Sequence, residues 1–237
     1  MNDYPRPSVT VDIVVFTVVD TDLKLLLVRR GVAPFEGRWA LPGGFVRVED
    51  GDSQGEDLEH AAYRELAEET GLPAGSVFLE QLYTFGRPGR DPRGRVITVA
   101  YYALVPPDRV PLVRAGSDAA GTRWFSVNEE LDRLDLAFDH SDIVERALER
   151  LRGKIDYAPV AFELVPPTFT VAELRAVHEA IKGHTYDPGN FRRRFLRLQT
   201  DGIIERAPGK RHTGTKPARV FRFVRQPRER RRKRRRG

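Results

Sequence analysis

One stretch, Asp57 to Leu72, most constrains the fold, because it reads as a single helix with carboxylates on its apolar side. Asp57 is a suitable N-cap residue, since its side chain can accept from the free N–H groups of the first turn. Gly71 suits the left-handed conformation that ends many helices. At about 100° per residue, two glutamates share the side of the small and apolar residues, with Glu68 at its edge. The residues on this side are Leu58, Ala61, Ala62, Glu65, Glu69 and Leu72.

The carboxylates of this helix admit two interpretations. Buried carboxylates packed together repel each other and lose solvation, and a divalent cation removes both costs. A cluster of oxygen ligands suits Mg²⁺ or Mn²⁺, which keep several waters and bind substrate phosphates. The ordinary alternative is a solvated charged face in which Arg64 and Glu68 form an i,i+4 pair. The glutamates on the apolar side, and the Pro42-Gly43-Gly44 segment before the helix, favour the metal site.

The segment RELAEETGL, Arg64–Leu72, resembles the second half of the Nudix box, G-x5-E-x7-R-E-U-x-E-E-x-G-U, in which U is aliphatic. Glu56 stands at the first Glu of that pattern, and Gly44 corresponds to its opening Gly. Eleven residues instead of five separate these two positions, so a segment such as EDGDSQ is inserted. The Nudix family therefore becomes the leading hypothesis for the first part of the chain.

The resemblance to the Nudix family implies an α/β/α sandwich and a site for pyrophosphate chemistry. It implies that Glu65, Glu68 and Glu69 bind the metal ions that activate water, with Glu56 as a further metal ligand. It also implies that Arg64 orients the carboxylates by ion pairing, so Arg64 and the three helical glutamates are the candidate catalytic residues.

Composition sets the broad class of the protein. The chain has 237 residues, of which 40% are hydrophobic, enough for two modest domains. It contains no cysteine, which excludes a disulfide framework and a thiolate metal site. The N-terminus lacks a signal pattern, and no apolar run is long enough to cross a bilayer. We therefore expect a cytoplasmic protein, associated with the nucleoid, that has no membrane partner.

Charge divides the chain. Residues 1–167 carry a net charge of −9, residues 168–224 carry +7, and the tail from Arg225 carries +8. The basic part is the candidate for binding nucleic acid. The tail has no apolar residues and cannot fold alone; it adds salt-sensitive affinity for polyanions or is simply solvated. We expect a Nudix domain at 1–155, a linker at 156–167, a DNA-binding domain at 168–225 and a disordered tail at 226–237.

The first domain shows further strands and one more helix. Val9–Val19 and Leu23–Arg30 are predicted to form a hairpin across Asp20-Thr21-Asp22. Trp39 is either a half-buried aromatic at a strand edge or a group that stacks on a ligand. The remaining predicted elements are strands at Val77–Phe85, 96–105 and Gly121–Val127 and a helix at Leu134–Arg152.

The loop Gly86–Arg95 carries four arginines between two predicted strands. Such a loop suits anionic groups, although a flexible solvated loop has the same composition. The segment FGRPGRDPRGRVITVAYYALV closely resembles Nudix proteins that act on ADP-ribose-like dinucleotides. This resemblance implies a ligand-binding set of arginines, namely Arg47, Arg90, Arg93 and Arg95.

His140 lies near the start of the predicted helix, beside Asp139. It is either a histidine used in capping or packing, or a general base or ligand contact. Asp139 or Ser141 could cap the helix. The sequence alone leaves the role of His140 open.

The basic part begins with a capping box formed by Thr170 and Glu173. A helix follows to Gly183, then a second helix from about Asn190 to Thr200, then a strand, a basic loop and a strand. This order is that of a winged helix-turn-helix, whose second helix enters the major groove. The alternative is a basic domain that packs on the first domain and binds no DNA. The candidate DNA-binding residues are Asn190, Arg192, Arg193, Arg194, Arg197, Lys210, Arg211, Lys216 and Arg219.

Together the two halves resemble the Nudix-related transcriptional regulators of NAD metabolism, especially in LAFDHSDIVERALERLRGKIDYAPVAFELVPPTFTVAEL and NFRRRFLRL. The resemblance implies a homodimeric repressor of NAD biosynthesis or salvage genes that senses ADP-ribose and binds a palindromic operator. One alternative is a Mg²⁺-dependent ADP-ribose pyrophosphatase, since the box retains its charged residues, and enzymatic activity is left open. A Nudix protein acting on RNA ends is another alternative, suggested by the basic tail.

Overall fold

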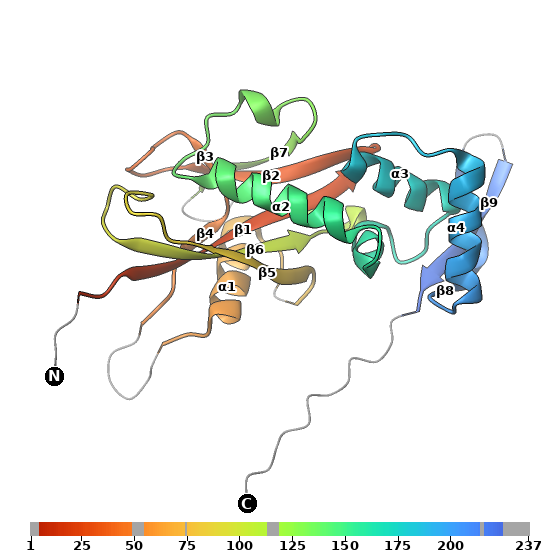
Figure 1. Cartoon of the computed structure of the whole chain (residues 1–237), viewed down its shortest axis with the longest axis horizontal. Helices are drawn as coiled ribbons and strands as arrows, with labels where there is room; N and C mark the ends of the chain where they lie inside the picture. The colour runs from red at the N-terminus through yellow and green to blue at the C-terminus, as the bar shows by residue number, and fades with distance from the viewer. Residues whose placement is uncertain (1–4, 49–54, 74, 113–118, 214–215, 225–237) are drawn as a thin grey trace, which may run out of the picture. The chain divides into compact units, whose positions relative to one another are not determined.

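The computed structural model describes residues 5–48, 55–73, 75–112, 119–213 and 216–224. The chain divides into two compact units (Figure 1), which are treated separately below. The first unit comprises residues 1–166 and 176–185, and the second comprises residues 167–175 and 186–237. The inserted EDGDSQ segment and the basic tail lie outside the described residues.

The first unit is built on a mixed sheet in the order β3-β2-β1-β6-β5, with β4 paired to β1 and β7 paired to β2. The predicted hairpin is confirmed, because β1 and β2 are antiparallel and Val19 pairs with Asp22 across the turn. β1 and β6 run parallel at the centre of the sheet. The strands are β1 (Ser8–Val19), β2 (Asp22–Arg30), β3 (Trp39–Ala40), β4 (Gly43–Phe45), β5 (Phe78–Phe85), β6 (Val96–Leu104) and β7 (Ala119–Ser126).

Two helices, α1 (Leu58–Thr70) and α2 (His140–Lys154), lie on opposite faces of this sheet (Figure 1). Alternate residues of β1, such as Val11 and Ile13, join α1 in one buried cluster. The residues between them, such as Val14, are also fully buried and point to the other face. A strand buried on both faces explains the nearly continuous apolar sequence of β1. The three-layer α/β/α arrangement expected from the sequence is thus confirmed.

The helix predicted from Leu134 begins only at His140. The preceding residues do not have helical backbone, because Leu136 forms a bridge with Trp39 and Phe138 has a left-handed φ of +55°. Three short 3-10 helices occur in the described residues of this unit: η1 (Pro107–Leu112), η2 (Leu131–Arg133) and η3 (Pro159–Leu164). η3 falls within the predicted linker and buries Val160, Ala161 and Leu164, so the first unit extends to Pro166.

The second unit contains the start of α3 (Val171–Lys182), then α4 (Pro188–Thr200) and the hairpin of β8 (Ile204–Thr213) and β9 (Lys216–Phe223). The capping box is confirmed: Thr170 N donates to Glu173 Oε2 at 2.7 Å, and Glu173 N donates to Thr170 Oγ1 at 3.2 Å. α4 begins earlier than predicted because Asp187 caps it, accepting from Asn190 N at 2.8 Å. Helix, helix and antiparallel hairpin follow one another in the predicted order.

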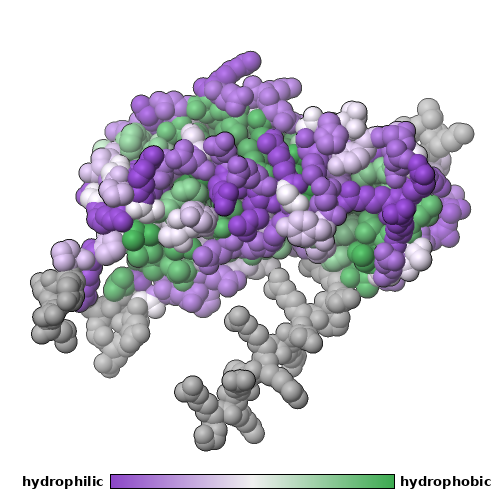
Figure 2. All heavy atoms as spheres, in the orientation of Figure 1, coloured by the Kyte–Doolittle hydropathy of each residue, from purple (hydrophilic) through white to green (hydrophobic). Residues whose placement is uncertain are grey.

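No helix within the described ranges is both long enough and apolar enough to span a membrane. The face shown in Figure 2 is largely hydrophilic, with hydrophobic side chains visible in patches over both units, including beside α4.

Candidate functional site: an acidic helix, a polar cavity and a basic winged helix

Helix α1 is terminated as predicted. The Asp57 side chain accepts from Glu59 N at 2.9 Å, and Gly71 adopts a φ of +74° while its N–H donates to Ala67 O at 2.9 Å. The predicted apolar side is also confirmed in large part, since Ala61, Ala62 and Leu72 are fully buried. Glu65 is only 8% exposed on that side.

The Pro42-Gly43-Gly44 segment passes close to both β1 and α1, which favours glycine at both positions. A Cβ on Gly44 would lie 2.4 Å from Glu65 Oε1, and a Cβ on Gly43 would lie 2.2 Å from Val11 O. Gly43 N donates to Glu69 Oε2 at 3.0 Å. The two glycines therefore bring the backbone against the carboxylates of the helix.

Arg64 forms the ion pairs that the Nudix resemblance implies. Its guanidinium donates to both oxygens of Glu56, at 2.5 and 2.9 Å, to Glu65 Oε1 at 2.6 Å and to Glu68 Oε2 at 3.0 Å. Hydrogen bonds from Arg64 lower the pKa of Glu56 to about 2, and the same bonds raise the pKa of Arg64. Glu56 thus joins the cluster despite the insertion that precedes it.

The metal-binding role of the glutamates remains a prediction. Within the described part of the chain, no three acidic or imidazole side chains are gathered at metal-ligand spacing. Arg64 holds Glu65 and Glu68, while Glu69 turns to Gly43. Burial raises the pKa of Glu69 to about 8 and also raises the pKa of Glu65. Buried carboxylates with too little positive charge around them are stabilised by a divalent cation, so these side chains are suitable ligands for Mg²⁺ or Mn²⁺.

A small polar cavity of about 70 Å³ lies beside Gly43 and Gly44 in the first unit. Its wall includes Thr10, whose Oγ1 is buried and has no hydrogen-bond partner among the described residues. A buried hydroxyl without a partner is costly unless a ligand or water completes it. The other lining residues are Asp12, Arg30, Leu41, Phe45, Arg90, Asp91, Arg93, Phe138 and His140.

Arg90, one of the predicted ligand-binding arginines, is held in an internal ion-pair network, and its contact with a ligand stays a prediction. Its Nε and NH2 donate to Asp139 at 2.9 and 2.6 Å, and NH2 also donates to Asp12 Oδ2 at 3.4 Å. The Arg90 side chain is 3% exposed. Burial opposes its charge, but the bonds to Asp139 and the charge of Asp12 outweigh burial and raise its pKa. Asp139 stands at the N-cap position of α2 but makes no capping hydrogen bond.

His140 is buried and neutral. Leu41 N donates to its Nδ1 at 2.9 Å, and burial lowers its pKa. The proton therefore lies on Nε2, which is 3.5 Å from Asp12 Oδ1. The structure favours the packing role that the sequence left open, because the ring fixes Leu41 in the cavity wall.

The other three predicted ligand arginines are not gathered in one place. Arg93 pairs with Asp91 at 2.6 Å and lies over the Phe45 ring at 4.8 Å, in the cavity wall. Arg95 donates to Gly86 O at 2.6 Å. Arg47 pairs with Glu68 at 3.0 Å, beside α1. Of the predicted set, Arg90 and Arg93 line the cavity.

Several cavity residues were not nominated from the sequence, among them Thr10, Asp12 and Arg30 and the aromatic residues Phe45 and Phe138. Arg30 lies 4.8 Å from the Phe138 ring centroid. Thr10 and Asp12 are two residues apart in β1, so they lie on the same face of an otherwise apolar strand. This pair of polar residues could have indicated a polar site on that face. Trp39 packs edge-on against Phe125, at 4.9 Å between ring centroids.

In the second unit, α4 buries Phe191 and Phe195 and exposes most of its arginines. Arg192, Arg193 and Arg197 are exposed, and Arg193 donates to the side chain of Asn190. Arg194 differs, because it is half-buried. The exposed arginines agree with the predicted DNA-binding face.

The hairpin divides its basic residues between two roles. Lys210 and Arg219 are exposed and pair in register. Arg211 instead donates to Glu173 Oε1 at 2.6 Å and to Thr168 O at 2.9 Å, which ties the hairpin to the start of α3. This arrangement favours a structural role for Arg211 over the predicted DNA contact. Lys216 opens β9, and its side chain lies outside the described part.

The chain matches the NUDIX domain family over residues 9–147 and the NrtR DNA-binding winged helix domain over residues 161–223. It is 37% identical over 223 residues to the ADPR responsive transcriptional repressor NtrR of Acinetobacter baylyi, covering 94% of this chain and 84% of the relative.

Two solved structures are similar as well. The Shewanella oneidensis NrtR complexed with a 27mer DNA superposes with a TM-score of 0.75 at 33% identity, over 91% of this chain and 93% of that one. The NUDIX domain of the same protein complexed with ADP ribose gives a TM-score of 0.54 at 36% identity, over 62% of this chain and 90% of that one. The chain therefore belongs to the NrtR family, in which a Nudix domain precedes a DNA-binding winged helix.

Proposed function

We propose that this protein is a transcriptional repressor that binds DNA through its winged helix and responds to ADP-ribose or a related dinucleotide through its Nudix domain. The observation that carries the proposal is the exposed row of Arg192, Arg193 and Arg197 on α4, in a chain whose first unit holds a separate polar cavity. The similar proteins named above combine the same two activities in their descriptions.

The cavity supplies groups suited to one part of a dinucleotide, since its volume of about 70 Å³ is smaller than the whole ligand. Arg93 and Arg30 carry positive charge beside the Phe45 and Phe138 rings, and Thr10 Oγ1 offers an unused hydroxyl. A diphosphate matches the arginines, and a ring system matches the aromatic faces. Arg47 and Arg95 lie outside the cavity lining and would serve longer parts of the ligand.

The operator, the assembly and the regulated genes follow from the family resemblance. We propose a homodimer on a palindromic site, since two-fold symmetry of a protein is matched by symmetry of its site. NAD biosynthesis or salvage genes are the proposed targets, and the cytoplasm is the proposed location. We also propose functional domains at 1–155 and 168–225, with residues 156–166 belonging to the first compact unit.

The decisive experiment measures binding to DNA selected from a random duplex pool, with and without ADP-ribose. The protein should prefer one duplex over random DNA, and ADP-ribose should change that affinity by the ~1–3 kcal/mol typical of allosteric coupling. If the protein bound selected and random duplexes equally well, the proposed repressor function would be wrong. Preference for RNA ends would favour the RNA alternative instead.

Arg193 provides the sharpest test on α4. Replacing Arg193 by Ala should weaken binding to the selected duplex by ~1–3 kcal/mol if its guanidinium reads a guanine edge. The half-buried Arg194 is the matched comparison, and its replacement by Ala should cost less operator affinity. A larger loss of duplex affinity in the Arg194 variant would mean that the other side of α4 contacts the bases.

Hydrolysis of ADP-ribose is a second candidate function, favoured by the intact Arg64 cluster. Glu65 and Glu69 would hold the metal ion, with Arg64 orienting Glu56, Glu65 and Glu68. A divalent ion held by these carboxylates would supply the activation of water for attack on the pyrophosphate. Gly44 leaves the Glu65 carboxylate uncovered, because any larger side chain at this position would meet it.

The Glu69→Gln variant separates the two functions. It should abolish Mg²⁺-dependent release of AMP from ADP-ribose while leaving duplex binding unchanged, because the second unit carries the DNA-binding face. Both activities should be measured on one preparation. Loss of both together would instead reveal a folding defect, which circular dichroism would detect.

A further inference from the structure

The exposed face of α4 has an apolar residue at its centre. At about 100° per residue, Leu196 falls between Arg192 and Arg193, with Gln199 and Thr200 on the next turn. Leu196 is 50% exposed. An exposed leucine is ordinary by itself. Its position in the middle of the arginine-bearing face gives that face an apolar contact point.

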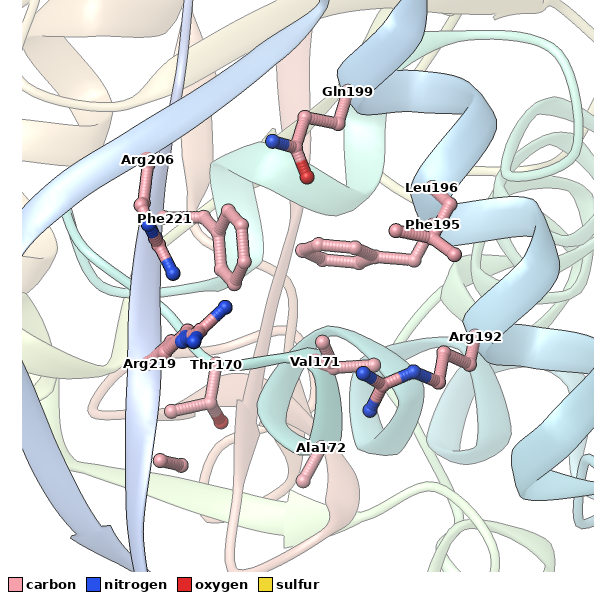
Figure 3. Close-up of a pocket in the computed structure, with 11 residues that line it drawn as sticks. Thr170, Val171, Ala172, Arg192, Phe195, Leu196, Gln199, Arg206, Arg219 and Phe221 are labelled. Atoms are coloured by element: carbon pink, nitrogen blue, oxygen red, sulfur yellow. The ribbon is translucent and has the colours of Figure 1, made fainter.

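Leu196 also stands at the rim of a groove within the second unit, with a volume of about 650 Å³ (Figure 3). The groove lies between α4, the first residues of α3 and the hairpin. Phe195 and Phe221 contribute rings to it, with centroids 4.7 Å apart at 77°. The interior of the groove is therefore apolar, and these two rings form part of it.

Three arginines reach toward this groove: Arg192 from α4, and Arg206 and Arg219 from the hairpin (Figure 3). The strand register explains the last two, because Arg206 pairs with Phe221 and Arg219 lies two residues along the same face. Among the described residues, none of the three forms an ion pair. Their neighbours do: Arg211 pairs with Glu173, and Arg222 pairs with Glu205 at 2.5 Å.

We propose that this groove seats one strand of the DNA duplex and that Leu196 contacts the C5-methyl group of a thymine. This inference rests on the DNA-binding function proposed above and adds the base that is read. Three uncompensated positive charges match successive phosphates, which position the strand. Among the base edges in the major groove, thymine is the one that presents a methyl group.

The thymine contact is tested by replacing each thymine of the selected half-site with deoxyuracil, which removes the C5-methyl group and keeps base pairing. For the wild-type protein, one replacement should weaken binding about fourfold, the value expected for one buried methyl group. In Leu196→Ala the same replacement should have no effect. In Leu196→Met, which keeps an apolar side chain, the loss should return.

The control variant for the deoxyuracil experiment is Val32→Ala. Val32 is an apolar residue of the first unit that is 66% exposed. This variant should show the wild-type sensitivity to deoxyuracil. Equal losses in wild type and Leu196→Ala at every thymine would overturn the methyl contact. Absence of any preferred duplex for the wild type would instead overturn the proposed repressor function, so the two failures are distinguishable.

The strand position is tested by the salt dependence of duplex binding. Arg206→Gln and Arg219→Gln should each reduce the slope of log affinity against log salt by about one. Arg222→Gln is the matched control on the same hairpin, since Arg222 is already paired with Glu205, and it should leave the slope unchanged. Unchanged slopes in Arg206→Gln and Arg219→Gln, with sequence preference intact, would exclude the groove as the strand seat.

Discussion

The two units of this protein use arginine in opposite ways. In the cavity of the first unit, Arg90 is buried between Asp139 and Asp12, and Arg93 is paired with Asp91. In the second unit, Arg192, Arg206 and Arg219 surround a groove without carboxylate partners in the described chain. The cavity holds Arg90 and Arg93 in internal pairs and leaves Arg30 without a carboxylate partner among the residues described, while the groove leaves all three of its arginines for an external anion.

This difference indicates what each site can bind. A buried, internally neutralised network costs little further desolvation when a small ligand enters, and its fixed geometry selects the shape of that ligand. Exposed and unpaired guanidinium groups release counterions when a polyanion binds, so they give affinity that depends on salt. The comparison therefore agrees with the proposed division, in which the first unit takes the dinucleotide and the second takes the duplex.

The largest expected effect comes from Arg90→Met. Removal of the guanidinium leaves the carboxylates of Asp12 and Asp139 buried and unpaired, which should cost ~3–5 kcal/mol in the free energy of unfolding. Denaturant unfolding measures this cost. The exposed pair provides the contrast, since Arg222→Gln should change the free energy of unfolding by less than about 1 kcal/mol. Similar costs for both variants would break the comparison between buried and exposed arginines.

The second effect concerns acid. Burial holds the pKa of His140 below its ordinary value, so the unfolded chain takes up a proton that the folded chain resists. Stability should therefore fall as the pH drops below about 6.5, by at most ~1.4 kcal/mol per pH unit.

The variant His140→Asn tests this acid effect, because its amide oxygen can replace Nδ1 as the acceptor for Leu41 N without titrating. Unfolding measured from pH 7 to pH 5 should show a smaller slope in His140→Asn than in the wild type. Parallel slopes would mean that His140 is protonated in the folded protein, and the cavity would then carry an additional positive charge.

The smallest effect distinguishes two arginines of one hairpin. Arg211→Ala removes hydrogen bonds to Glu173 and Thr168, which should cost ~1 kcal/mol of stability in the second unit. It should leave the salt slope of duplex binding unchanged, because its donors are already occupied. A reduced slope would return Arg211 to the DNA-binding set and would weaken the division between structural and binding arginines.

Sequence patterns predicted the elements that depend on local interactions. The cap at Asp57, the end at Gly71 and the capping box of Thr170 and Glu173 all involve residues within one or two turns of each other. The β1–β2 hairpin follows from a short turn between a β-branched run and a leucine-rich run. Such features are encoded in neighbouring residues, so they can be recognised without the fold.

Features that join distant residues were not predictable in this way. The helix at Leu134 was predicted too long because Leu136 pairs with Trp39, a residue far away in the chain. The ion pair of Arg90 could not be predicted because its partner Asp139 lies 49 residues away. Thr10 and Asp12 appeared as strand residues until the fold placed them in the cavity wall.

The sequence by itself determined the two-part organisation, the glutamate-bearing helix with its glycine turn, and the basic helix followed by a hairpin. The tertiary structure alone decided which arginines are neutralised and which are free to bind. The physical reason is that the charge of a side chain follows from its residue type. Its ion-pair partner, in contrast, depends on contacts between distant segments that form only in the folded chain.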